Sequence, residues 1–172
     1  MVPHWLYGWL RFQRYMSKLR HLNLILGDQL DAESLLFNDF DPQQDRLWMA
    51  EVTAESTDSL SSKQRTVLFL SAMRHFAKQL RSDNYPLIYW TLSDKKPRFY
   101  DALSATLKQQ AFETIRCVLP GDVRVMNEIQ QLADDVDTPV EWLADQHFIT
   151  EKGEFKAWLA DNRPDAIIHF AE

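Results

Sequence analysis

The chain has 172 residues, of which 45% are hydrophobic, and a formal net charge of −6. This length fits one globular domain with a single sizeable core and excludes a two-domain enzyme. Residues 1–20 carry four basic residues and no acidic one, so the rest of the chain holds 15 bases against 25 acids, and such an acidic body disfavours non-specific binding to DNA.

Cysteine content and hydropathy bear on the compartment of the protein. Cys117 is the only cysteine, which excludes an intramolecular disulfide and favours the cytoplasm. No apolar run reaches the ~18 residues that a membrane span needs. Residues 1–20 are predicted to be an N-terminal extension that packs on a single α/β domain over residues 21–172. The alternative for the extension is an interfacial helix, because its aromatic residues are followed by basic ones.

The first predicted strand covers residues 21–26, and its apolar run ends abruptly in Gly27-Asp28-Gln29. This pattern indicates a buried strand that leads into a tight turn, with a carboxylate and an amide at its carboxyl end. In an open α/β sheet, ligands bind outside the carboxyl ends of the strands, where the strand order reverses. A short helix is expected next, over residues 31–37, with Asp31 as its N-cap.

The remaining predicted elements alternate between strand and helix. Strands are expected over residues 46–52, 87–92, 114–119 and 140–143. Helices are expected from Ser61-Ser62 to Asp83-Asn84, from Pro97 to Ala111, from the N-cap Asp122 to Asp134, and over 153–159. This alternation predicts a Rossmann-like α/β fold, an open five-stranded parallel sheet with helices on both faces. The first strand is the most apolar and therefore central, and the expected order is 3-2-1-4-5.

With that strand order, the first and fourth strands are neighbours, and the turns that follow them line one crevice. Gly27 and Gly121, one in each turn, allow the backbone to approach a flat ligand closely. Asp28 and Glu55 are suited to accept hydrogen bonds from ribityl hydroxyls or ring N–H groups, and the helix after the second turn offers N–H donors. The residues alone are equally compatible with a structural role, in which Asp28 caps the following turn.

Several catalytic arrangements are missing from the sequence. No Gly-x-Gly-x-x-Gly follows the first strand, and neither a Walker loop nor a Gly-x-Ser-x-Gly elbow occurs. The acidic cluster at residues 134–137 is typical of a solvated helix end, so no metal site is predicted. Cys117 is expected to be an inert buried thiol, and no catalytic residue is assigned.

Five segments, taken in order, carry a resemblance to a known family. They are Leu24-Ile25-Leu26-Gly27-Asp28-Gln29-Leu30, Glu51-Val52-x-Ala54-Glu55, Ser71-Ala72-Met73-Arg74-His75-Phe76-Ala77, Pro120-Gly121-Asp122-x-Arg124-Val125, and Phe148 with Gly153-Glu154-Phe155. The set resembles the N-terminal domain of the photolyase-related proteins, which are the iron–sulfur bacterial cryptochromes and the prokaryotic (6-4) photolyases. The resemblance covers residues 22–158.

The resemblance implies that the crevice holds an antenna chromophore, 6,7-dimethyl-8-ribityllumazine. The residues that match positions around that pocket are Gly27, Asp28, Ala50, Val52, Glu55, Gly121 and Asp122. Arg74 and His75 match a shared helix motif and are expected to be structural or to dock a second domain. In the family, a helical C-terminal domain carries FAD, a [4Fe–4S] cluster held by four cysteines, and the DNA-lesion site.

The chain departs from the family pattern in three places. With one cysteine it cannot hold the cluster, and it has no room for the FAD-binding bundle, so we expect no catalysis by this chain alone. Ser61-Ser62-Lys63 stands where the family usually has His-His-Lys. Phe69 is expected on the face of the long helix nearest the pocket, where its ring crowds a lumazine; we include it among the cofactor-site residues.

The sequence thus predicts the N-terminal domain of a photolyase- or cryptochrome-related DNA-repair protein, with a lumazine antenna as its ligand. The expected partners are this flat chromophore and either a helical photolyase domain or a second copy of the chain, without direct contact to nucleic acid. Two alternatives stay open. One is a ligand-free interaction module of the same fold, and the other is a small flavodoxin-like nucleotide-binding enzyme.

Overall fold

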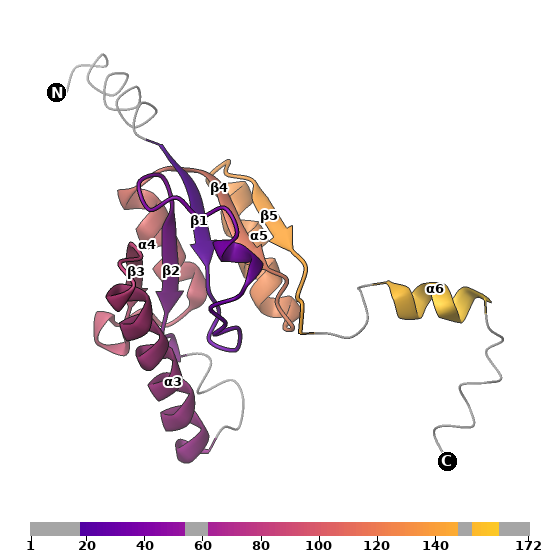
Figure 1. Ribbon diagram of the computed structural model, residues 1–172, viewed down its shortest axis with the longest axis horizontal. Coiled ribbons are helices and arrows are strands. Elements are labelled where there is room, and N and C mark those ends of the chain that lie inside the picture. Colours follow the sequence, from indigo (N-terminus) through magenta and orange to yellow (C-terminus); the bar gives the residue numbers. More distant parts are fainter. Residues whose placement is uncertain (1–17, 54–61, 148–152, 162–172) are drawn as a thin grey trace.

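The computed structural model describes residues 18–53, 62–147 and 153–161, and its described part is built on a five-stranded, all-parallel sheet (Figure 1). The strands are β1 (Leu19–Leu24), β2 (Arg46–Ala50), β3 (Leu87–Trp90), β4 (Phe112–Val118) and β5 (Val140–Leu143). Their order is β3-β2-β1-β4-β5, with every neighbouring pair parallel. The Rossmann-like fold and the strand order predicted from the sequence are confirmed.

Helices cover both faces of the sheet. α3 (Lys63–Ser82) and the short 3-10 helix η1 (Leu35–Phe37) pack on one face, whereas α4 (Phe99–Gln109) and α5 (Val123–Asp135) pack on the other (Figure 1). A second 3-10 helix, η2 (Leu92–Asp94), follows β3, and α6 (Glu154–Asp161) comes after β5. Within the described ranges, no helix combines the length and the apolar character needed to cross a bilayer.

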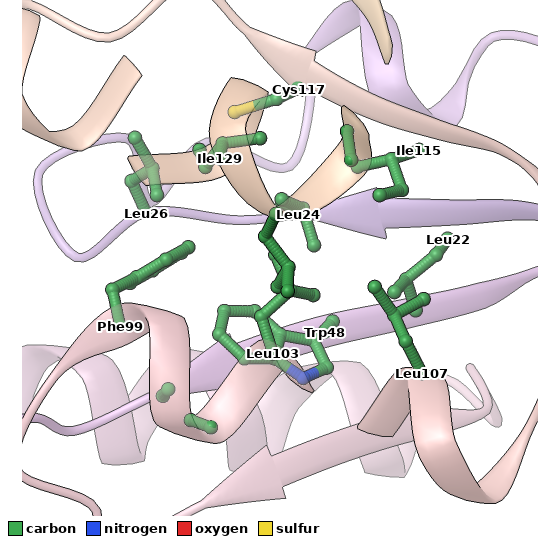
Figure 2. Packing of buried hydrophobic residues seen from close by; sticks show 14 of the residues in the cluster. Leu22, Leu24, Leu26, Trp48, Phe99, Leu103, Leu107, Ile115, Cys117 and Ile129 are labelled. Atoms are coloured by element: carbon green, nitrogen blue, oxygen red, sulfur yellow. The ribbon is translucent and has the colours of Figure 1, made fainter. Parts of the chain in front are cut away.

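The core has two layers because successive strand residues point to opposite faces of the sheet. Figure 2 shows the layer under α4 and α5, where Trp48 of β2 lies beside Leu103 and Leu24. On the other face, Leu47 and Met49 of the same strand pack under α3. The central strand β1 contributes Leu22 and Leu24 to the layer under α4 and α5, and Ile25, directly after the strand, packs in the layer under α3.

The sheet begins earlier than the sequence predicts. The backbone N–H of Leu19 donates to the carbonyl of Ala111 at 3.0 Å, and that of Arg20 donates to Gln44 at 2.8 Å. Leu19 and Arg20 therefore lie in the sheet, although the sequence analysis placed them in the N-terminal extension. Residues 1–17 of that extension lie outside the described residues, so its packing stays a prediction.

The helix predicted over residues 31–37 is wrong in most of its length. Only Leu35–Phe37 are helical, as a single 3-10 turn, and Ser34 rather than Asp31 is the N-cap. The Asp31 carboxylate instead accepts from the backbone N–H of Glu33 at 2.9 Å. A local bond of this kind forms with or without a helix behind it, so it does not by itself start one.

For the long helix α3, the predicted N-cap is confirmed, but not every residue predicted to face the core is buried. Ser62 caps it as predicted, since its hydroxyl accepts from the backbone N–H of Arg65. Val67, which the periodicity placed toward the core, is 67% exposed. The buried residues of α3 begin at Met73, because the first half of the helix extends past the carboxyl end of the sheet (Figure 1).

Candidate functional site

The turns after β1 and β4, between which the crevice is predicted, lie side by side. β1 and β4 pair directly, with Leu24 opposite Cys117. Beyond the strands, the side-chain amide of Gln29 donates to the carbonyl of Leu119 at 3.1 Å. This bond links two turns that are 90 residues apart in the chain and sets them at the point where the strand order reverses.

Asp28 presents a carboxylate at this crevice. Its side chain is exposed, and it has no hydrogen-bond or ion-pair partner within the ranges that the structure describes. The turn around it is closed instead by the backbone N–H of Gln29, which donates to Leu26 at 3.0 Å. Among the described residues, no bond shows Asp28 capping the following turn, and no described donor engages its oxygens.

Cys117 lies below the crevice and is fully buried. Burial, and to a smaller extent the nearby Asp28 carboxylate, raises the pKa of its thiol well above the ordinary value. A thiol held in the protonated form is a weak nucleophile, so Cys117 is structural. This geometry assigns Cys117 no nucleophilic role.

The two glycines of the crevice have opposite surroundings. A Cβ atom placed on Gly121 would meet nothing within 4 Å. A Cβ atom placed on Gly27 would overlap Cζ of Phe69, lie 2.7 Å from Cε1 of the same ring, and lie 3.0 Å from the sulfur of Met73. A side chain at position 121 would thus meet no described atom within 4 Å, whereas the Phe69 ring lies directly against Gly27.

Asp122 is the N-cap of α5, as the sequence predicts. Its carboxylate accepts from the backbone N–H of Arg124 at 2.8 Å and from the guanidinium of the same residue at 2.7 Å. The side-chain bond from Arg124, followed by the backbone bond, holds the pKa of Asp122 below its usual range. Because these bonds engage both carboxylate oxygens, the first role of Asp122 is to begin α5.

The other predicted site residues divide between core and crevice. Ala50 and Val52 are 4% and 5% exposed, and their side chains pack in the layer under α4 and α5. Any contact that they make with a ligand would come chiefly from backbone atoms. Phe69 lies on the opposite face of the sheet, in the layer under α3. Glu55 lies outside the described residues, so its role stays a prediction.

Glu51 is a buried carboxylate at the end of β2 that the sequence analysis did not place in the site. Its oxygens accept from Nε of Arg74 at 2.7 Å, from Nη2 of Arg74 at 2.8 Å, from the hydroxyl of Tyr89 at 2.5 Å, and from the backbone N–H of Leu92 at 3.0 Å. Four donors leave no capacity for a ligand, so Glu51 is structural: it joins α3, β3 and η2 at the edge of the crevice.

The electrostatics of this cluster follow from its hydrogen bonds. Burial alone would raise the pKa of Glu51, but the bonds from Arg74, Tyr89 and Leu92 hold it below the ordinary value. Burial and the bond to Glu51 raise the pKa of Tyr89. The available signal in the sequence was a Glu directly after an apolar strand, together with the Arg of the shared helix motif.

The outer face of α3 carries a shallow groove of about 470 Å³ away from the crevice. Its lining residues are Val67, Leu70, Ser71, Arg74, His75 and Lys78. His75 is exposed there, whereas Arg74 reaches back to Glu51. Of the two motif residues, Arg74 thus has the structural role that was expected, and the docking role of His75 stays a prediction.

Comparison with known proteins finds one matching family and a relative of known name. The family model described as deoxyribodipyrimidine photo-lyase-related protein matches residues 23–170. A (6-4) photolyase from Agrobacterium fabrum (strain C58 / ATCC 33970) is 29% identical to this chain over 154 residues, which cover 88% of the chain. The same alignment covers 30% of the length of that photolyase. The matched region includes both turns of the crevice.

Proposed function

Because this chain belongs to the deoxyribodipyrimidine photo-lyase-related protein family, we propose that it is an antenna-type N-terminal domain that holds a flat chromophore in the crevice between β1 and β4. The observation that carries this proposal is the bond from Gln29 to Leu119, which brings the two turns together at the strand-order reversal. The chromophore that the resemblance favours is 6,7-dimethyl-8-ribityllumazine.

The residues at the crevice suit part of such a ligand. Asp28 offers carboxylate oxygens that no described residue engages, and these match the hydroxyl and N–H donors of a ribityl heterocycle. Gly121 leaves its side of the crevice open, so a flat ring can approach the backbone there. The lumazine would supply light absorption, and the protein would contribute its binding and orientation.

In the family that the sequence resembles, repair requires FAD and a [4Fe–4S] cluster, and the described residues include no set of cysteines that could hold the cluster. Four thiolates hold a [4Fe–4S] cluster, whereas this sequence has one cysteine, which is buried in the core. We therefore assign FAD, the cluster and contact with the DNA lesion to a helical domain, the proposed partner of this chain. We further propose the cytoplasm as the compartment of this domain, because its single cysteine fits a reducing environment.

The proposed function is tested by titrating the protein with 6,7-dimethyl-8-ribityllumazine and following the quenching or shift of lumazine fluorescence. We expect saturable binding that weakens by about tenfold in Asp28→Asn, since one charge-assisted hydrogen bond is lost. Glu113→Gln, which neutralises an exposed carboxylate on β4 away from the turns, is the matched control and should bind as wild type does. Absence of binding at saturating lumazine would refute the proposal.

A second candidate function is a ligand-free interaction module, and the exposed apolar residues of α3 favour it. Val67, which lines the groove on the outer face of the helix, is 67% exposed, and its chain neighbour Leu68 is 72% exposed. Apolar side chains gathered next to a groove are typical of protein contacts. Light scattering tests this function: a dimer that dissociates in Val67→Ser/Leu68→Ser would support it, whereas a wild-type monomer at all concentrations would remove it.

A further inference from the structure

The close contact between Gly27 and Phe69 singles out one residue of the crevice. The φ angle of Gly27 lies outside the left-handed region, so its backbone conformation is open to any residue. Only the neighbouring side chains, the Phe69 ring and the Met73 sulfur, exclude a Cβ atom there. Gly27 is therefore required by the aromatic ring that lies on it and not by the geometry of its own turn.

In the proposed function a flat ligand lies against the turn after β1, and the Phe69 ring already covers Gly27 of that turn. An aromatic ring against a glycine backbone makes the same kind of contact that a bound heterocycle would make. On the β4 side, the space above Gly121 is empty of protein atoms within 4 Å. We propose that Phe69 determines the affinity of this crevice for flat heterocycles, because its ring is an internal occupant that a ligand must displace.

Contacts with the sheet hold α3, the helix that carries Phe69, in place. Binding of a ligand next to Gly27 would therefore require movement of the Phe69 ring and not of the helix. Arg74, five residues further along α3, holds both oxygens of Glu51 at the end of β2. Met73 is buried on the same side of the helix and is 1% exposed. With α3 held at these points, space next to Gly27 opens only when the Phe69 side chain changes its rotamer.

The first experiment measures lumazine binding in Phe69→Ala and rests on the proposed function. We expect affinity to rise by about tenfold, because the ligand no longer has to displace a packed ring. Leu68→Ala removes the neighbouring, exposed side chain of α3 and should bind as wild type does. Equal or weaker binding in Phe69→Ala, with wild-type binding intact, would overturn this inference and leave the antenna function standing. Absence of binding in every variant would overturn both.

The second experiment needs no ligand and tests the internal contact by a double-mutant cycle in urea unfolding. We expect Gly27→Ala to reduce the folding equilibrium constant by about tenfold in the wild-type background, because the new methyl group collides with the ring. In the Phe69→Ala background the same change should have a clearly smaller effect, because only the contact with the Met73 sulfur remains. An equal effect in both backgrounds would show that the ring does not lie on Gly27 in solution and would refute the proposal.

Discussion

At the scale of single residues, the described carboxylates differ in their burial and in the number of hydrogen bonds that they accept. Asp45 is fully buried and accepts from the guanidinium of Arg20 and from the backbone N–H groups of His21 and Asp41. Glu51 is equally buried and equally engaged. Asp28, by contrast, is exposed at the crevice. The hydrogen bonds that each carboxylate accepts, and not its residue type, distinguish the structural Asp45 and Glu51 from Asp28, the candidate ligand-binding residue.

Glu51→Gln is expected to destabilise the protein by about 2 kcal/mol at neutral pH. The substitution keeps the shape but turns one acceptor into a donor that faces other donors, and it leaves the half-exposed Arg74 without its charge partner. Urea unfolding measures the effect. Glu113→Gln, on the exposed side of β4, is the control and should stay within ~0.5 kcal/mol of wild type.

The same two buried acids predict the pH dependence of stability. Hydrogen bonds overcome the effect of burial and lower the pKa of Asp45 and of Glu51 in the folded protein below the ordinary values of 3.8 and 4.5. The unfolded chain therefore binds more protons in this range, so the stabilisation is complete above about pH 4.5 and is lost as the pH falls through the lowered values. Urea midpoints should fall between about pH 5 and about pH 3, and less steeply in Glu51→Gln. An unchanged slope would contradict this assignment.

At the scale of elements, the capping residues show what is needed to start a helix. Ser62 and Asp122 each accept from a backbone N–H in the first turn of the following helix, α3 and α5 respectively. Asp31 makes a similar local bond without a helix behind it. A capping residue thus acts only where an amphipathic stretch follows, because most helical stability comes from packing of the buried face.

Asp122→Ala should lower the midpoint of thermal unfolding by about 2–4 °C, whereas Asp122→Asn should leave it nearly unchanged. Asparagine keeps the side-chain oxygen that caps α5, and the exposed charge pair with Arg124 contributes little. Differential scanning calorimetry distinguishes the two variants. If both lowered the midpoint equally, the charge of Asp122 and not its capping oxygen would be the important feature.

At the scale of the whole molecule, one buried threonine joins the sheet to α4. The hydroxyl oxygen of Thr106 accepts from the indole N–H of Trp48 at 2.8 Å and from that of Trp90 at 2.9 Å, and its own O–H donates to the carbonyl of Ala102 at 3.2 Å. Two strands and one helix therefore depend on a single polar group inside the apolar layer that Figure 2 shows.

Thr106→Val removes that hydroxyl and leaves two indole N–H groups without an acceptor. We expect a loss of about 2 kcal/mol in the free energy of unfolding, with a change in tryptophan emission. Thr106→Ser retains the hydroxyl and should lose less, only the packing of one methyl group. If the serine and valine variants were equally destabilised, the methyl group and not the hydroxyl would account for the role of Thr106.

The sequence by itself determined the architecture, the strand order and two helix caps. These features depend on local patterns: the apolar run of β1, the alternation of strands and helices, and Ser62 and Asp122 ahead of amphipathic stretches. The pattern also placed the turns after β1 and β4 in one crevice, because carboxyl ends of neighbouring parallel strands meet at one edge of a sheet.

Only the tertiary structure decided what each side chain does there. Glu51 is saturated by donors from three other elements, and Gly27 is covered by a ring that stands 42 positions later in the chain. Ala50 and Val52 point into the core and not into the crevice. Contacts of this kind join residues far apart in the sequence, and their geometry is set by packing density, which no local pattern encodes.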